Sequence, residues 1–209
     1  MPNKIKNVFI EAGGFDYKLM FITLGYTVVP KPEEADLIVF TGGADVSPHM
    51  YGDKAHPATF NHTYRDAKEE RLFAFAKDKN IPCVGICRGG QFLNVMSGGR
   101  MYQDVTKHTA PHYITDHFTG EVIYVSSTHH QMMMPGGDAQ VVATSNLKGN
   151  REWYDLEIFR KDVADEDYEV LFYERTKCLC FQPHPEFTGV PYEGMTSYFK
   201  SLIDRYLEN

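Results

Sequence analysis

The chain has 209 residues, 43% of them hydrophobic, and a formal net charge of −7 at pH 7. This length can bury a sizeable core, and because no linker, repeat or low-complexity stretch interrupts the sequence, we expect residues 1–209 to form one domain. The acidic balance, without a run of lysine or arginine, argues against nucleic acid or an anionic membrane as a partner. No apolar segment reaches the length of a membrane span or a signal sequence, and the four cysteines follow no disulfide framework. We therefore expect a cytoplasmic protein.

In the first half of the chain, short apolar runs alternate with helical patterns. The apolar runs predict strands over 7–10, 26–29, 36–40 and 83–86. The helical patterns between and after them predict helices over 15–24, 64–79 and 88–97. This alternation is typical of a parallel sheet that is covered by helices.

Later apolar runs lie closer together and predict antiparallel additions to that sheet. These runs cover 121–125, 140–144, 156–160 and 169–173, and they are followed by a buried strand over 178–181 and a final helix over 192–207. The expected fold class is therefore α/β: a flavodoxin-like open, mostly parallel sheet with helices on both faces and a few antiparallel additions.

One cysteine lies at a sharp junction between a predicted strand and a predicted helix. Cys87 is framed by Gly85 and Gly89, and a side chain held on a tight strand-to-helix turn needs such small neighbours. Its sulfur would lie at the N-terminus of the helix, where the helix dipole and free N–H groups favour a thiolate. The pattern predicts that Cys87 is a nucleophile, and the alternative is a small buried core residue.

A cysteine nucleophile needs a base, and a second motif supplies one. His184 and Glu186 follow the predicted strand over 178–181, which Pro183 and Pro185 bring to an end. Residues two apart in an extended segment point the same way, so Glu186 can hold the His184 ring while its other nitrogen faces the cysteine.

The cysteine turn and the His-Pro-Glu loop together resemble the class I glutamine amidotransferase superfamily. Further motifs resemble its γ-glutamyl hydrolase branch, which includes the γ-glutamyl-γ-aminobutyrate hydrolases. These motifs are Thr41 to Pro48, Tyr51-Gly52, Arg65-Asp66 with Glu69, Arg88 after the cysteine, and Gly98-Gly99 leading to Tyr102, Gln103 and Asp104. The matches run from about position 39 to about position 190, nearly the whole chain.

The resemblance implies an activity and roles for individual residues. Cys87 would attack the γ-carbonyl group of glutamine or a γ-glutamyl amide, giving a thioester that water cleaves. His184 would be the base, and Glu186 would orient it. The backbone N–H groups of Gly43 and Arg88 would form an oxyanion hole. Substrate contacts would come from Gln91, Thr128, His130 and Gln131, and no cofactor is implied.

The remaining cysteines and the histidines of one connection have simpler interpretations. The cysteines lie in apolar runs, fit no zinc spacing and are expected to pack inside strands: Cys83, Cys178 and Cys180. The connection between Asp104 and Ser127 carries three histidines that could bind a metal, but we expect solvated loop residues because these are far commoner: His108, His112 and His117. No metal site is therefore predicted.

Other residues of the motifs also have simpler interpretations. Gln91 could face solvent from its helix instead of contacting a substrate. The run from Thr63 to Asp66 predicts a capping box at a helix start. We expect His129 to be structural, because His184 already has the partner that a base needs.

Three functions remain open at this point. A free-standing hydrolase of γ-glutamyl amides is favoured by Arg88, by the loop from Asp45 to Pro48 and by the lack of a synthetase domain in these 209 residues. A glutaminase subunit that delivers ammonia to a synthetase partner is the second, and a binding or regulatory module without turnover is the third. The identity of the leaving amine and the formation of a homo-oligomer also remain open, since specificity resides in loops without a recognised pattern.

Overall fold

The computed structural model describes residues 4–208 of the chain. The helices are α1 (Phe15–Thr23), α2 (Thr63–Asp78), α3 (Arg88–Met96) and α4 (Glu193–Tyr206), with short 3-10 helices η1 (Pro32–Glu34), η2 (Pro48–Tyr51) and η3 (Val190–Tyr192). The strands of the first half are β1 (Asn7–Glu11), β2 (Thr27–Val28), β3 (Leu37–Phe40), β4 (Cys83–Ile86), β5 (Arg100–Tyr102) and β6 (Asp104–Val105). The later strands are β7 (His112–Asp116), β8 (Val122–Val125), β9 (Met132–Met134), β10 (Gln140–Ser145), β11 (Asn150–Asp155), β12 (Ile158–Val163), β13 (Asp167–Tyr173) and β14 (Cys178–Phe181).

A nine-stranded sheet in the order β2-β1-β3-β4-β14-β13-β10-β7-β8 forms the centre of the fold. The pairings from β2 across to β14 are parallel, and those from β14 to β8 are antiparallel. Every residue of β3, β4 and β14 is buried, as expected for parallel strands covered on both faces. Because parallel strands end at the same edge, the loops that follow these three strands meet there.

Helices cover both faces of this sheet. Alternate residues of the parallel strands pack with Phe21 of α1 and with Phe199 and Leu202 of α4 in one buried cluster. The intervening residues pack with Phe73 of α2 and Phe92 of α3 in a second cluster on the opposite face. The strand alternation therefore supplies two cores, one for each helical layer.

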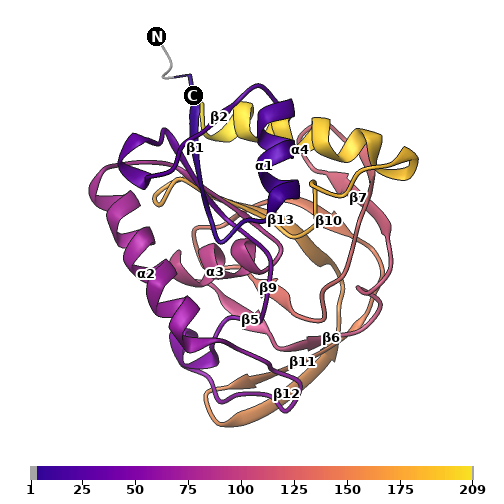
Figure 1. The fold of residues 1–209 in the computed structure, drawn as a ribbon. Helices are drawn as coiled ribbons and strands as arrows, with labels where there is room; N and C mark the ends of the chain where they lie inside the picture. Colours follow the sequence, from indigo (N-terminus) through magenta and orange to yellow (C-terminus); the bar gives the residue numbers. More distant parts are fainter. Residues whose placement is uncertain (1–3, 209) are drawn as a thin grey trace.

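Two smaller sheets lie beside the central one. β12, β11 and β6 form a three-stranded sheet, and β5 pairs with β9. In Figure 1 the β11–β12 hairpin lies at the end of the molecule that is remote from α1 and α4. In the three-stranded sheet, β11 and β12 form an antiparallel hairpin that pairs Asn150 with Val163 at its open end and Asp155 with Ile158 next to its turn.

These observations confirm the α/β class and the helices on both faces, and they correct several details. The strand expected over 156–160 is instead a turn followed by β12, and it belongs to the three-stranded sheet. The capping box expected at Thr63 is wrong: His62 precedes the helix and its Nδ1 accepts the Arg65 N–H at 3.4 Å. Cys83, Cys178 and Cys180 are buried strand residues with free thiols, as predicted.

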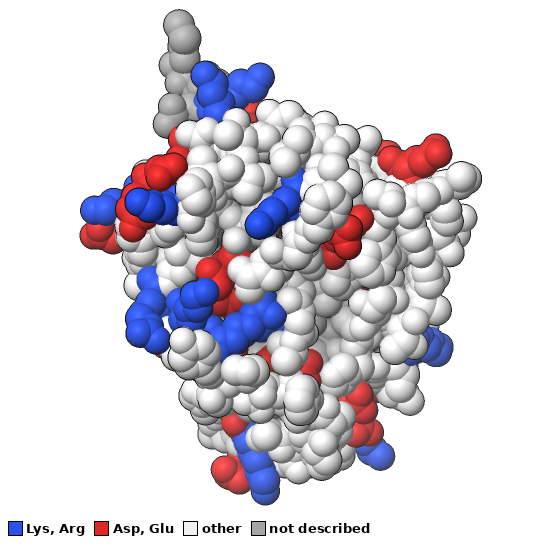
Figure 2. Space-filling model, viewed as in Figure 1, with Lys and Arg blue, Asp and Glu red and all other residues white. Residues whose placement is uncertain are grey.

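The charged side chains on the face viewed in Figure 2 are mixed in sign. The main group of lysine and arginine side chains lies over α2 and has acidic side chains beside it, so this face offers no continuous basic surface. Within residues 4–208, none of the helices combines the length and the hydrophobicity that crossing a bilayer requires.

Candidate active site

Cys87 occupies a strained turn between β4 and α3. Its φ of +51° and ψ of −114° lie in a region that residues with side chains rarely adopt. A Cβ atom on Gly85 would overlap the Gly89 backbone, and one on Gly89 would overlap the Phe40 carbonyl group. The two glycines are therefore needed for the close approach of helix and strands, and the turn leaves Cys87 8% exposed.

His184 and Glu186 lie in the loop after β14, as the sequence predicted. The His184 Nδ1 lies 2.6 Å from the Glu186 Oε1, and both side chains are largely buried. Since a carboxylate only accepts hydrogen bonds, Nδ1 donates and the opposite ring nitrogen remains for Cys87, with which His184 also shares a hydrogen bond. Ser126 fixes the loop by accepting the His184 N–H at 2.9 Å and donating to the His184 carbonyl at 3.2 Å.

The environment of His184 favours its protonated form. Burial lowers the pKa of His184, but the hydrogen bonds and charges of Cys87 and Glu186 outweigh burial and raise the pKa to about 10. Phe187 stacks on the ring, with the ring centroids 4.9 Å apart and the planes 17° from parallel. An imidazolium therefore faces the Cys87 sulfur at neutral pH.

The glycine loop after β3 borders the cysteine and the histidine. A Cβ atom on Gly42 would lie 2.9 Å from the His184 Cε1 and 3.7 Å from the Cys87 Cβ. The Gly42 N–H donates to the Tyr17 hydroxyl at 3.2 Å, and that hydroxyl also contacts Glu186. Burial and then the Glu186 charge raise the pKa of Tyr17, so this hydroxyl stays protonated. No sequence motif indicated Tyr17, because α1 is remote from the motifs in the chain.

Arg65 of α2 anchors the same loop from behind. Its Nη1 donates to the Gly42 carbonyl and its Nη2 to the Thr41 carbonyl, each at 2.8 Å, while its Nε bonds Glu69 at 2.8 Å. The guanidinium fills the space where a Gly43 side chain would lie, and Gly43 has a φ of +146°. Both the conformation and the space at position 43 therefore require glycine.

Arg88 connects this loop to the start of α3. Its guanidinium is 1% exposed, pairs with Asp66 and Glu69, and donates from Nε to the Ala44 carbonyl at 3.1 Å. Burial, and then repulsion from Arg65, lower the pKa of Arg88 to about 10, while Asp66 opposes both effects. The backbone N–H of Arg88 is one of the first in α3, where the N–H groups have no acceptor within the helix.

The residues expected to contact substrate take different positions. Gln91 is buried, so the alternative in which it faces solvent is wrong: its Nε2 donates to the Gln131 carbonyl at 3.1 Å and to the Gln182 Oε1 at 3.2 Å. The Gln131 side chain is also buried and donates to the Gln103 carbonyl at 3.1 Å.

The other two expected substrate contacts are more accessible. His130 is half-buried, with its Nε2 3.3 Å from the Asp45 Oδ1. The hydrogen bond to Asp45 is the main cause that raises the pKa of His130. Thr128 is exposed to solvent on the same segment. Gln91, His130 and Gln131 are thus held by the protein itself, whereas Thr128 is exposed.

The histidines of the connection before Ser127 do not form one group. His117 is exposed and its Nε2 lies 2.9 Å from the Thr144 hydroxyl. His108 and His112 are buried beside Glu169, so the expectation of solvated loop residues is wrong for both. In the described part of the chain, His108, His112 and Glu169 form the one group of three such side chains whose donor atoms lie close enough together to hold a metal ion.

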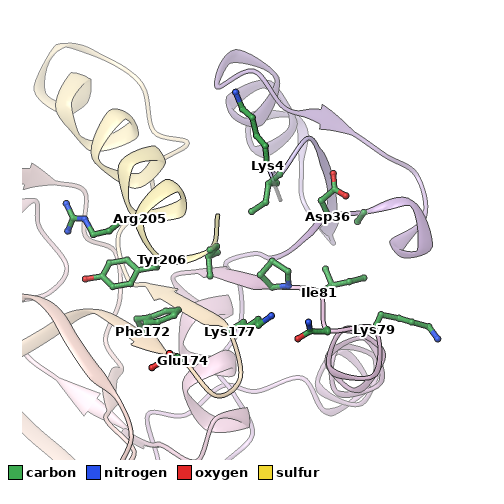
Figure 3. A pocket seen from close by; sticks show the side chains of 14 residues that line it. Lys4, Asp36, Lys79, Ile81, Phe172, Glu174, Lys177, Arg205 and Tyr206 are labelled. Atoms are coloured by element: carbon green, nitrogen blue, oxygen red, sulfur yellow. The ribbon is translucent and has the colours of Figure 1, made fainter. Parts of the chain in front are cut away.

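A cavity of about 590 Å³ lies at the opposite edge of the sheet from Cys87. Figure 3 shows its labelled side chains, among them Lys4, Asp36, Ile81 and Lys177, which precede strands instead of following them. Ligands in open α/β sheets bind beyond the carboxyl ends of strands, so this cavity is separate from the candidate active site.

Comparisons with known proteins place the chain near glutamine amidotransferases. A sequence model of the family described as Peptidase C26 matches residues 8–150. The glutamine amidotransferase-like protein YvdE of Lactococcus lactis subsp. lactis is 35% identical over 147 residues, which cover 54% of this chain and 62% of YvdE. The carbamoyl phosphate synthase small chain of Polynucleobacter asymbioticus is 26% identical over 132 residues, which cover 63% of this chain and 28% of that protein. The chain therefore matches less than two thirds of the length of either relative.

A solved structure shows the same fold. A glutamine amidotransferase from Thermotoga maritima superimposes with a TM-score of 0.66, over 99% of this chain and 100% of that chain, at 16% sequence identity. At this identity the likeness concerns the fold, and it agrees with the helix-covered sheet described above.

Proposed function

Because this chain belongs to the Peptidase C26 family, we propose that it is a cysteine-dependent hydrolase of the γ-amide bond in glutamine or a γ-glutamyl amide. The observation that carries the proposal is the arrangement of Cys87, His184 and Glu186 at the carboxyl ends of β4 and β14. A strained nucleophile turn, a base and a carboxylate that holds the base are the parts that acyl transfer through a covalent intermediate needs.

In the first step, the Cys87 thiolate attacks the γ-carbonyl carbon and the carbonyl π electrons move to oxygen. The developing oxyanion accepts hydrogen bonds from the N–H groups of Gly43 and Arg88. The intermediate collapses as its C–N bond breaks, and the His184 imidazolium gives its proton to the departing nitrogen. The γ-glutamyl group remains bound to Cys87 as a thioester, and ammonia or an amine leaves.

In the second step, water cleaves the thioester. His184, now neutral, accepts a proton from the water as its oxygen bonds to the carbonyl carbon. The C–S bond breaks, glutamate leaves and the Cys87 thiolate is restored opposite the His184 imidazolium. Glu186 stays ionised throughout and stabilises that imidazolium through the 2.6 Å contact.

For the glutamyl group, we propose contacts with Gln91 and with the segment from Thr128 to Gln131. His130 is half-buried beside Asp45 and Asp104, which raise its pKa, and we assign its ring as a hydrogen-bond donor to the substrate carboxylate. Gln91 and Gln131 support that segment through the hydrogen bond between them.

A second candidate is a glutaminase subunit that passes ammonia to a synthetase partner. The similarity to the small chain of carbamoyl phosphate synthase favours this alternative. A binding or regulatory module without turnover is the third, and the intact site argues against it.

Turnover by the purified chain separates these candidates. Glutamate release is measured from free glutamine and from a panel of γ-glutamyl amides, with Cys87→Ala as the inactive variant. We expect Cys87-dependent release without a partner. Labelling of Cys87 by an electrophilic glutamine analogue without turnover would favour the glutaminase subunit, and neither labelling nor turnover would favour the binding module. The buried Cys83, Cys178 and Cys180 serve as internal controls for labelling.

A further inference from the structure

A buried cluster of three histidines and two acidic residues lies beside the segment from Ser126 to His129, whose first residue bonds the His184 backbone. His108 follows β6, His112 begins β7 and His129 lies between β8 and β9. Asp167 and Glu169 come from β13. All five side chains are 6% exposed or less, although residues of these types are mostly exposed in proteins.

Each histidine has one ring nitrogen directed at an acceptor outside the centre of the cluster. The His112 Nδ1 lies 3.2 Å from the Ala110 carbonyl, and the His129 Nδ1 lies 2.8 Å from the Gln131 carbonyl. In a metal-bound site both Nδ1 atoms would carry the proton, because a carbonyl only accepts and the opposite nitrogens would face the ion. The His108 Nε2 faces the Asp167 Oδ1 at 3.5 Å.

The other nitrogen of each ring points to one carboxylate oxygen, the Glu169 Oε1. The distances to this oxygen are 3.2 Å from the His108 Nδ1, 3.1 Å from the His112 Nε2 and 3.9 Å from the His129 Nε2. The candidate donor atoms of His108, His112 and Glu169 all lie within 4.8 Å of one another. Among the described residues, the buried atoms without a hydrogen-bond partner include both ring nitrogens of His108, the His129 Nε2, the Asp167 Oδ1 and the Glu169 Oε2.

We propose that His108, His112, His129 and Glu169 bind one zinc ion. In a tetrahedral site with metal–ligand bonds of about 2.0–2.1 Å, neighbouring ligand atoms are about 3.3 Å apart. The Glu169 Oε1 lies at this spacing from the His108 Nδ1 at 3.2 Å and the His112 Nε2 at 3.1 Å, while the His129 Nε2, at 3.9 Å, would move inward to become the fourth ligand. The outward hydrogen bonds of His112 and His129 to backbone carbonyls match the usual second shell of zinc sites, and the Asp167 Oδ1 lies 3.5 Å from the outward nitrogen of His108. Imidazole and carboxylate ligands suit zinc among the common metals.

Charge counting supports a divalent cation over protons alone. If each neutral ring keeps its proton on the outward nitrogen, the inward lone pairs face the Glu169 carboxylate with no proton between them. Protonating all three rings would instead bury three positive charges against the two carboxylates of Asp167 and Glu169. Protonating His108 alone would balance only one of these carboxylates and leave the His129 Nε2 without a partner. One divalent ion with neutral rings balances these two carboxylates and satisfies every inward atom.

The ion would be structural and would support the candidate active site without entering its chemistry. The Ser127 hydroxyl and the His129 N–H both donate to the His108 carbonyl. These bonds tie the segment from Ser127 to His129 to the proposed ligand His108. Ser126, directly before it, holds the His184 backbone. The proposal does not depend on whether the chain hydrolyses γ-glutamyl amides.

The test measures metal binding by the tag-free full chain. Zinc affinity is determined by competition with a chromogenic chelator, and cobalt(II) is used as a spectroscopic probe. We expect one zinc per chain and the visible absorption of tetrahedral cobalt without a thiolate-to-cobalt charge-transfer band. His112→Ala should weaken zinc binding by at least about 100-fold, because losing even an outer-shell partner costs 10–100-fold. His117→Ala, from the same connection, should bind zinc like the unaltered chain.

Three results would overturn the proposal. One is an unaltered chain that takes up less than one zinc at micromolar free metal. A thiolate-to-cobalt band would instead place the ion on a cysteine. Equal zinc affinity in His112→Ala and His117→Ala would show that zinc binds somewhere other than the histidine cluster. If His112→Ala does not fold, the stoichiometry and the cobalt spectrum of the unaltered chain still decide the question.

Discussion

Arg65 donates a hydrogen bond of 2.8 Å to the carbonyl of Gly42, and this bond holds the loop after β3 against α2. The same guanidinium takes the space beside Gly43. The orientation of the Gly43 N–H, which we assign to the oxyanion hole, therefore depends on a side chain of α2.

Gly43→Ala should remove most of the activity. An alanine has no room beside Arg65 and does not favour a φ of +146°, so the loop must shift and the N–H leaves its place. We expect kcat to fall by about 10²–10³, the usual loss for one oxyanion donor, with a smaller change in KM. Gly14→Ala is the control, because a Cβ at that position meets open space. A Gly43→Ala enzyme with full kcat would rule out this role for the loop.

Glu69→Gln should destabilise the fold. Glu69 is fully buried and pairs with Arg65 and Arg88, so its neutral replacement leaves buried positive charge without compensation. We expect the free energy of unfolding to fall by about 3 kcal/mol. Denaturant unfolding measures this loss. Glu70→Gln changes an exposed residue on the same helix and should stay within about 0.5 kcal/mol of the unaltered chain. An equal loss of unfolding free energy in Glu69→Gln and Glu70→Gln would contradict the stabilising role of the Glu69 ion pairs.

His184 should titrate far above the usual range of histidine. Its pKa is raised to about 10 from 6.5, although burial opposes this, because Cys87 and Glu186 stabilise the charged ring. Between these two values the folded chain binds the proton and the unfolded chain does not, so His184 contributes stability below about pH 6.5 that is lost as the pH rises through about 10. Imidazole ¹⁵N NMR follows the titration directly.

The Cys87→Ala variant tests the cause of this shift. Removing the sulfur removes the first of the two stabilising partners, so the pKa of His184 should fall and the loss of stability at alkaline pH should shrink. An unchanged His184 titration in Cys87→Ala would show that the sulfur and the imidazole do not interact.

Glu186→Gln should reduce turnover while leaving the fold intact. The amide keeps the size of the side chain but no longer stabilises the imidazolium or fixes the proton on Nδ1. We expect kcat for Cys87-dependent glutamate release to fall by about 10²–10⁴. Glu193→Gln, an exposed residue in the first turn of α4, is the matched control. If the two variants had the same kcat, Glu186 would have no part in the reaction.

The sequence determined the parts of the protein that depend on local pattern. The alternation of apolar runs and helical periods predicted the parallel strands and all four helices, because burial and backbone geometry repeat over short distances. The glycine frame predicted the turn at Cys87, and the prolines around His184 predicted the end of β14, since both are local constraints of the backbone.

Only the tertiary structure decided which distant side chains meet. Tyr17 reaches Gly42 from α1, and Arg65 and Arg88 hold the glycine loop from two different helices. The sequence favours solvated loop positions for His108 and His112 because solvated histidines are far commoner than metal ligands, yet β13 brings Glu169 within 3.2 Å of both rings. Such contacts join segments that are far apart in the chain, and their partners are fixed by how the sheet and its helices pack.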